Sequence, residues 1–140
     1  MKKINILLII IFVCFSHKAT YSYENFIKYK INNEIITNFD LSKEEKYLLA
    51  LNPKLSNLEK NQLRSLAKNS IINEKIKKIE LDKFFELNKN KDDPVLKSIV
   101  EDLFDNIGNV DEKSITNHLS SHDLTFEWVR EKIKIETWIK

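Results

Sequence analysis

The chain has 140 residues, with 23 Lys and Arg against 21 Asp and Glu, so its formal net charge is only +2. Charges of both signs alternate along the chain, whereas proteins that bind nucleic acids usually carry a basic stripe. The densest basic run, "KIKK" at residues 75–78, is flanked by Glu74 and Glu80 and is typical of a solvated helix face. We therefore expect no nucleic-acid partner.

The first 22 residues have the three-part pattern of a secretory signal peptide. Residues 1–3 are basic after Met1, residues 4–15 ("INILLIIIFVCF") are almost entirely apolar, and residues 16–22 are mostly small or polar. The apolar run is shorter than the roughly 20 residues that a membrane-spanning helix needs. We predict cleavage after Ser22, a periplasmic location, and membrane contact only through this peptide before cleavage. An uncleaved N-terminal anchor is the alternative.

Cleavage would leave residues 23–140 as one domain, because their number suits a single hydrophobic core. The only cysteine, Cys14, lies in the segment that would be removed, so the mature chain would have neither a disulfide nor a thiolate metal site. Loss of Lys2, Lys3 and Lys18 would change the net charge to about −1.

Residues 26–37 predict a β-hairpin. Two short runs rich in Ile and Tyr are separated by Asn32-Asn33, and Asn tolerates the positive φ angles of a two-residue hairpin turn. A hairpin alone is marginally stable in water. We therefore expect it to pack on the helices that follow.

Helix caps and helix breakers divide the remaining chain into five predicted helices. The first begins at Asn38, at Asp40 or at a capping box that starts with Ser42, and ends before Pro53. A second capping box, starting with Ser56, opens the next helix. The predicted helices cover approximately residues 40–52, 58–87, 94–107, 111–122 and 125–140.

The long second helix is apolar on two sides. One face carries Leu63, Leu66, Ala67, Leu81, Phe84 and Phe85, and the nearly opposite face carries Ile72, Ile76 and Ile79. Neighbouring elements normally surround a helix of this kind. We therefore predict a mainly α fold, a five-helix orthogonal bundle around one long central helix, with a short N-terminal β-hairpin. The helix at 94–107 has one apolar face, with Leu96, Ile99, Val100, Leu103 and Ile107.

The last predicted helix also has two apolar stripes. The first stripe contains Phe126, Val129 and Ile133, and can pack inside the bundle. The second needs another partner, and we predict that it binds peptides. Its residues are Trp128, Ile135, Trp138 and Ile139. The alternative is that these side chains belong to the core.

No catalytic motif stands out. The mature chain has no Cys nucleophile and no Gly-rich phosphate loop, and we assign its many carboxylates to solvated helix faces. His118 and His122 share one helical face, with Asp123 as a candidate third metal ligand, but Leu119 stands where zinc peptidases carry Glu. We interpret both histidines as surface residues at a helix end, and expect no catalytic residue, metal or cofactor.

Three segments, taken in order after a signal peptide, resemble the N-terminal domain of the SurA-type periplasmic chaperones. "YKINNEIITNFDL" at 29–41 is similar to their strand, Asn-Asn turn, strand and acidic helix start. "SIINEKI" at 70–76, followed by "IELDKFFEL", is similar to a recurring helix segment. "HLSSHDLTFEWVREKIKIETWIK" at 118–140 is similar to their last N-domain helices.

The resemblance implies a holdase that keeps unfolded outer-membrane polypeptides soluble without ATP, through an apolar groove for extended apolar peptides. The family's parvulin-type isomerase domains have no counterpart here, and His122-Asp123 stands where the family often has Gly. Two alternatives remain open. In the first alternative, the chain is part of a peptidyl-prolyl isomerase whose catalytic domain is missing. In the second, it is a helical adaptor subunit with one permanent partner.

Overall fold

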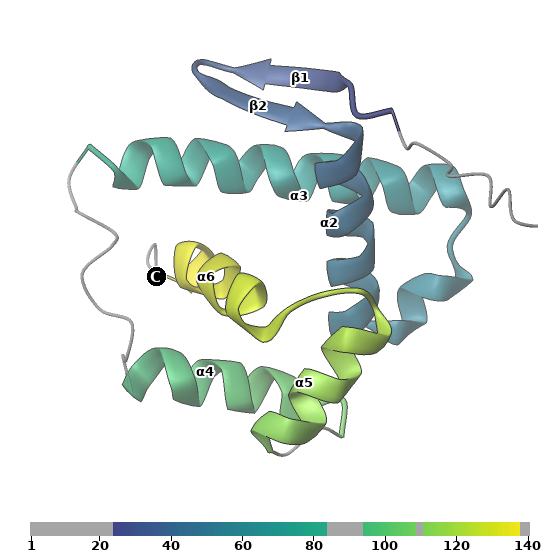
Figure 1. Ribbon diagram of the computed structural model, residues 1–140, viewed down its shortest axis with the longest axis vertical. Coiled ribbons are helices and arrows are strands. Elements are labelled where there is room, and N and C mark those ends of the chain that lie inside the picture. Colours follow the sequence, from purple (N-terminus) through teal and green to yellow (C-terminus); the bar gives the residue numbers. More distant parts are fainter. Residues whose placement is uncertain (1–23, 84–93, 109–110, 138–140) are drawn as a thin grey trace, which may run out of the picture.

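The computed structural model describes residues 24–83, 94–108 and 111–137, and confirms the mainly helical fold with an N-terminal β-hairpin (Figure 1). The predicted signal peptide and Phe84, Phe85, Trp138 and Ile139 lie outside these residues. The described elements are β1 (Ile27–Ile31), β2 (Glu34–Thr37), α2 (Asn38–Leu51), the 3₁₀ helix η1 (Pro53–Asn57), α3 (Lys60–Leu81), α4 (Pro94–Asp105), α5 (Glu112–Ser121) and α6 (Phe126–Thr137).

The elements form an upper and a lower tier, with α6 between them (Figure 1). The upper tier contains the hairpin and α3, and the lower tier contains α4 and α5. Helix α2 packs on α3, and α6 contacts α3, α4 and α5. The hairpin, α2 and α6 all contact α3. The two apolar faces predicted for this helix are only partly covered, because Leu66 of one face and Ile76 of the other are 44% and 47% exposed.

Helix α2 begins with a capping box formed by Thr37 and Asp40. The Asp40 amide donates to Thr37 Oγ1 at 3.2 Å, and the Thr37 amide donates to Asp40 Oδ2 at 2.8 Å. The helix begins at Asn38, as one of the predictions has it, but Thr37 and not Asn38 is the cap. The alternative starts at Asp40 and Ser42 are wrong. The box predicted at Ser56 is also wrong, because its hydroxyl donates to the Pro53 carbonyl at 2.7 Å within η1.

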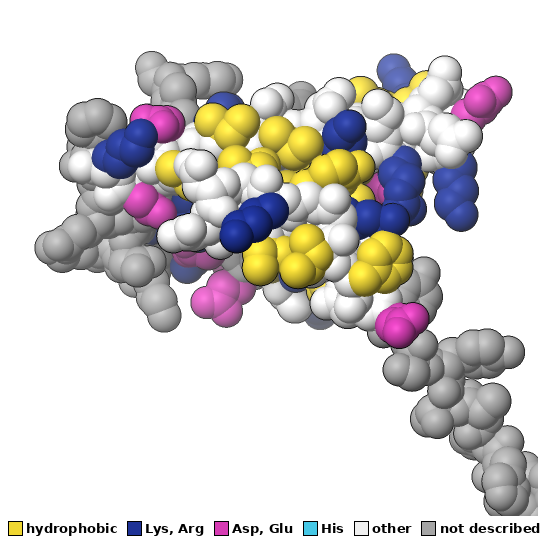
Figure 2. Space-filling view, turned by 90° about the horizontal axis from the view of Figure 1, so that it is seen from above, with side chains coloured by type: hydrophobic (Ala, Val, Ile, Leu, Met, Phe, Trp, Pro, Cys, Tyr) yellow, Lys and Arg dark blue, Asp and Glu magenta, His cyan; other side chains and the backbone are white. Residues whose placement is uncertain are grey.

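The two-residue turn of the hairpin is confirmed, with Ile31 paired to Glu34 and a positive φ of 52° at Asn32. The inner face of the hairpin packs on α2 and α3 in a small cluster, which we call the upper core. Its residues are Ile36, Leu41 and Ile71, with Tyr29, Ile31 and Ile72 at its edge. Seen from the hairpin side, other hydrophobic side chains lie exposed among Lys and Arg (Figure 2).

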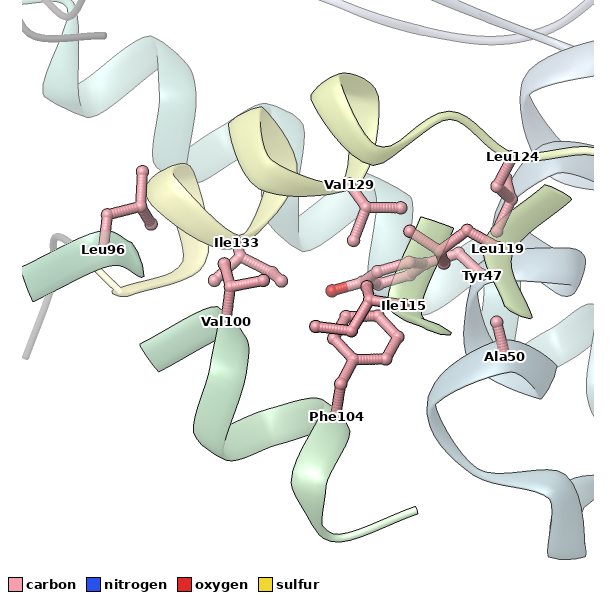
Figure 3. Close-up of a cluster of buried hydrophobic side chains, with 10 residues drawn as sticks. All are labelled: Tyr47, Ala50, Leu96, Val100, Phe104, Ile115, Leu119, Leu124, Val129 and Ile133. Carbon is pink, nitrogen blue, oxygen red and sulfur yellow. The ribbon is translucent and has the colours of Figure 1, made fainter. Parts of the chain in front are cut away.

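A larger cluster, which we call the lower core, joins α2, α4, α5 and α6. Figure 3 shows these side chains pointing toward one another, with the aromatic ring of Phe104 among them. The residues are Tyr47, Ala50, Leu96, Val100, Phe104, Ile115, Leu119, Leu124, Val129 and Ile133. The predicted apolar face of residues 94–107 omitted Phe104, although this side chain is fully buried. Phe104 widens the buried face of α4 toward α5, where its ring lies edge-on to that of His118 with centroids 6.2 Å apart.

The turn between α5 and α6 contains a residue with a left-handed backbone conformation. Asp123 has a positive φ of 56°, a left-handed conformation that Gly and Asn adopt most readily. The Asp123 carboxylate accepts a hydrogen bond from Lys46 Nζ at 2.9 Å, which ties the turn to α2. A backbone that favours Gly is therefore present at this turn, with Asp in place of Gly.

We predict that Leu119→Ala lowers the free energy of unfolding by about 2–5 kcal/mol, because it leaves a cavity in the lower core. Leu119 is 0% exposed, whereas Leu66 on α3 is 44% exposed and provides a matched control. Leu66→Ala should cost less than about 1 kcal/mol. Urea unfolding followed by circular dichroism measures both. Similar losses for the two variants would contradict the assignment of Leu119 to the core.

We also predict that the hairpin loses stability in acid. Glu34 Oε2 accepts a hydrogen bond from Lys75 Nζ at 2.8 Å, and Lys78 Nζ lies 3.5 Å from Oε1. The hydrogen bond from Lys75 lowers the pKa of Glu34, although burial opposes it. A lowered folded-state pKa stabilises the fold above the unfolded pKa of about 4.5, and this stabilisation disappears as the pH falls through the folded pKa.

Glu34→Gln should therefore be less stable than the native chain at pH 7, and the difference should be smaller at about pH 2–3, because a protonated Glu34 loses its ion pair. Thermal unfolding at both pH values tests this. A stability difference that stays constant with pH would mean that the ion pair does not contribute.

Candidate functional site

A cleft of about 440 Å³ lies between α3, α4 and α6. Its apolar wall is formed by Ile99, Leu103 and Ile133. Its polar wall is formed by Ser70, Asn73, Glu74, Lys77, Glu136 and Thr137. An extended polypeptide presents apolar side chains together with backbone N–H and C=O groups. The two walls of this cleft can contact both kinds of group.

A buried ion cluster lies behind the polar wall. Lys132 Nζ of α6 lies 2.8 Å from Glu44 Oε2 of α2 and 3.7 Å from Glu136 Oε1, and it is in contact with Glu74 Oε2 of α3. The side chain of Lys132 is 2% exposed and that of Glu44 is 0% exposed. One ammonium group therefore links three helices away from water.

Two hydroxyl groups donate hydrogen bonds to carboxylate oxygens of this cluster. Ser70 Oγ donates to Glu44 Oε1 at 2.6 Å, and the Tyr47 hydroxyl donates to Glu136 Oε2 at 3.1 Å. Lys132 Nζ also lies 4.9 Å from the centroid of the Tyr47 ring. Each buried charge therefore has an oppositely charged partner. Glu44 Oε1 is also hydrogen-bonded, whereas Glu44 Oε2 is paired with Lys132 but has no hydrogen bond.

The surroundings shift the pKa values of the cluster. Burial raises the pKa of Glu44, although Lys132 and Ser70 oppose the shift. Burial alone would lower the pKa of Lys132, but Glu44 and Glu74 outweigh this effect and raise it, so the ammonium stays charged. Burial and then Glu136 raise the pKa of Tyr47, which keeps its hydroxyl a hydrogen-bond donor.

The structure places Trp128 and Ile135 at partly buried positions on α6. The Trp128 ring packs edge-on against Tyr47, with centroids 5.7 Å apart, and Lys43 Nζ lies 4.3 Å from the Trp128 centroid. Trp128 therefore packs against its own chain on at least two sides. A peptide-binding role for Trp128 and Ile135 stays a prediction, and Trp138 and Ile139 lie outside the described residues.

The expectation that carboxylates lie on solvated helix faces is wrong for Glu44, which is fully buried, and for Glu74, which is mostly buried. The sequence contains a signal for these buried carboxylates. Leu41, Glu44 and Tyr47 follow one another at three-residue spacing, so a charged residue stands within an apolar stripe. Lys132 likewise follows Trp128 by four residues. Charges at such positions require partners that spacing alone does not identify.

His118 and His122 do not form a metal site with Asp123. His118 Nε2 is hydrogen-bonded to the Ala50 carbonyl at 2.8 Å, and Asp123 is paired with Lys46. Within residues 24–83, 94–108 and 111–137, no group of three His, Cys, Asp or Glu side chains is placed to hold a metal ion. In the same ranges, no helix has the length and apolar character needed to cross a membrane.

Comparison of the chain with protein-family models, with curated proteins and with solved structures finds no match.

We predict that Lys132→Met lowers the free energy of unfolding by about 3–5 kcal/mol, because Glu44 would remain as an uncompensated buried charge. Addition of Glu44→Gln should recover part of this loss. Lys97→Met provides the control, since Lys97 pairs with Glu101 at 3.8 Å on the exposed face of α4. Chemical denaturation measures the free energy of unfolding of Lys132→Met, of the double variant and of the control. A cost for Lys132→Met as small as that of the control would contradict a stabilising role for the cluster.

Proposed function

We propose that this chain is an exported holdase domain that binds unfolded outer-membrane polypeptides in the periplasm without ATP. The cleft between α3, α4 and α6 is the binding site in this proposal. The observation that carries it is the pairing of an apolar wall, containing Ile99 and Leu103, with a polar wall on α3. The resemblance to SurA-type chaperones supports the same function.

The chemistry of the cleft suits weak and reversible binding of many sequences. Apolar client side chains lose water against the α4 wall, which favours binding in proportion to the apolar area that they bury. The hydrogen-bonding groups of Asn73, Lys77 and Thr137 can pair with a client backbone whatever its sequence. Such a site requires neither a cofactor nor a nucleotide.

We predict that Asn73→Trp abolishes most of the holdase activity by filling the cleft. Asn73 is exposed and lines the cleft, so the larger side chain occupies client space without removing core atoms. Asn61→Trp is the matched control, because Asn61 is exposed on the same helix and does not line the cleft. Suppression of aggregation of an unfolded outer-membrane β-barrel protein should weaken about tenfold, or 1.4 kcal/mol, in Asn73→Trp only.

The aggregation assay and two further measurements separate the alternatives. A native chain that does not protect the unfolded client, but binds one folded protein in a fixed ratio, would favour the adaptor subunit. Prolyl isomerase activity in a longer product of the gene would favour the isomerase. Equal protection by Asn73→Trp and Asn61→Trp would place client binding elsewhere, with the Trp128 stripe as the next candidate.

A further inference from the structure

Three large apolar side chains lie exposed where the described chain begins. Phe26 is 48% exposed, Ile27 is 63% exposed and Phe39 is 58% exposed. Ile27 pairs with Thr37 across the hairpin, two residues before Phe39, so all three lie at the same end of the hairpin. We call them the entry patch. Figure 2 shows hydrophobic side chains exposed on the face that carries the hairpin.

Asn38 holds the entry patch in a fixed position. The Phe26 amide donates to Asn38 Oδ1 at 2.7 Å, the Asn38 amide donates to the Phe26 carbonyl at 3.1 Å, and Asn38 Nδ2 donates to the Glu24 carbonyl at 3.1 Å. Asn38 is itself buried. Its three hydrogen bonds fix the backbone of residues 24–26 to the start of α2, so the exposed rings belong to an ordered surface.

Basic groups surround the entry patch. Lys28 Nζ lies 4.3 Å from the centroid of the Phe26 ring, and Lys30 is exposed on the same strand. A second hollow beside Phe26 is lined by Lys60 and Arg64 together with Glu24 and Glu45. Glu45 is paired with Arg64 at 3.5 Å, so Lys60 and Glu24 balance each other in this hollow. The excess of positive charge beside the patch comes from Lys28 and Lys30.

Aromatic and aliphatic side chains next to Lys are typical of proteins that lie on the surface of an anionic bilayer. The sequence also brings the patch to a membrane, because only eight residues, 16–23, separate the apolar residues 4–15 from Glu24. Eight residues can span at most about 28 Å. We propose that the entry patch docks this domain on an anionic membrane surface. This contact is separate from the one that the N-terminal segment makes before its removal.

Two single-cysteine labels in the full chain with Cys14→Ser test which face meets the bilayer. A polarity-sensitive fluorophore is attached at Asn25→Cys, beside the entry patch, or at Ser121→Cys, on α5 in the opposite tier (Figure 1). With vesicles that contain phosphatidylglycerol, the label at residue 25 should shift to shorter wavelength and be quenched by spin-labelled lipid. The label at residue 121 should change little. Equal responses, or no response at residue 25, would overturn the proposal.

A second measurement tests the side chains themselves in a chain that begins at Glu24, with circular dichroism used to verify its helices. Phe26→Ser with Phe39→Ser should lower partitioning into phosphatidylglycerol vesicles about tenfold, because membrane affinity follows the apolar area buried. Leu66→Ser with Ile76→Ser, two other exposed apolar positions, should have a smaller effect. Equal effects of the two pairs would overturn the proposal.

Self-association is the competing explanation of the patch. If the label at residue 25 shifts without vesicles and sedimentation shows a dimer, the patch is an interface between two copies and the membrane proposal fails. Should the shorter chain not keep its helices, the label at residue 25 is compared in the full chain with and without Phe26→Ser and Phe39→Ser. An unchanged response would overturn the proposal, because the apolar residues 4–15 alone would then explain it. Neither measurement depends on the holdase proposal, which the aggregation assay tests separately.

Discussion

The buried ammonium of Lys132 connects the parts of this domain. It contacts Glu44 of α2, Glu74 of α3 and Glu136 of its own helix, at a site where its side chain is only 2% exposed. Removing an ammonium and its carboxylates from water is costly, and the cost is met only when every partner is in place. The cluster therefore requires α2, α3 and α6 to keep one relative arrangement.

Helix α2 shows how the two cores depend on this cluster. Leu41 belongs to the upper core, Tyr47 and Ala50 belong to the lower core, and Glu44 lies between them on the same face. A polar layer thus separates two apolar cores. Helix α6, which carries Lys132, lies between α3 and α4 (Figure 1), and the cleft with one apolar and one polar wall is formed by these three helices.

In the proposed functions, the hairpin end carries the membrane contact and the cleft binds the client. The hairpin is held on α3 by the upper core and by the pairing of Glu34 with Lys75 and Lys78, and Asn38 fixes its entry. That arrangement positions the entry patch on the upper tier. The cleft lies between α3 and the lower tier, so a domain docked through the entry patch leaves a separate surface for a client.

Local patterns in the sequence were sufficient for the fold class, because hairpin turns and helix caps depend on residues a few positions apart. The Asn32-Asn33 turn and the start of α2 at Asn38 follow from such patterns. The starts proposed at Ser42 and Ser56 failed because several polar residues near each start can cap a helix. The structure has Thr37 as the cap of α2 and Glu59 as the cap of α3.

Only the tertiary structure decided the site. Glu44, Glu74 and Lys132 lie far apart in the chain, and no local pattern states that three helices bring them together. The orientation of Phe104 toward the lower core and the packing of Trp128 on Tyr47 were likewise set by neighbouring helices. Periodicity indicates that a helix has an apolar or charged face, but long-range packing determines which other element packs against that face.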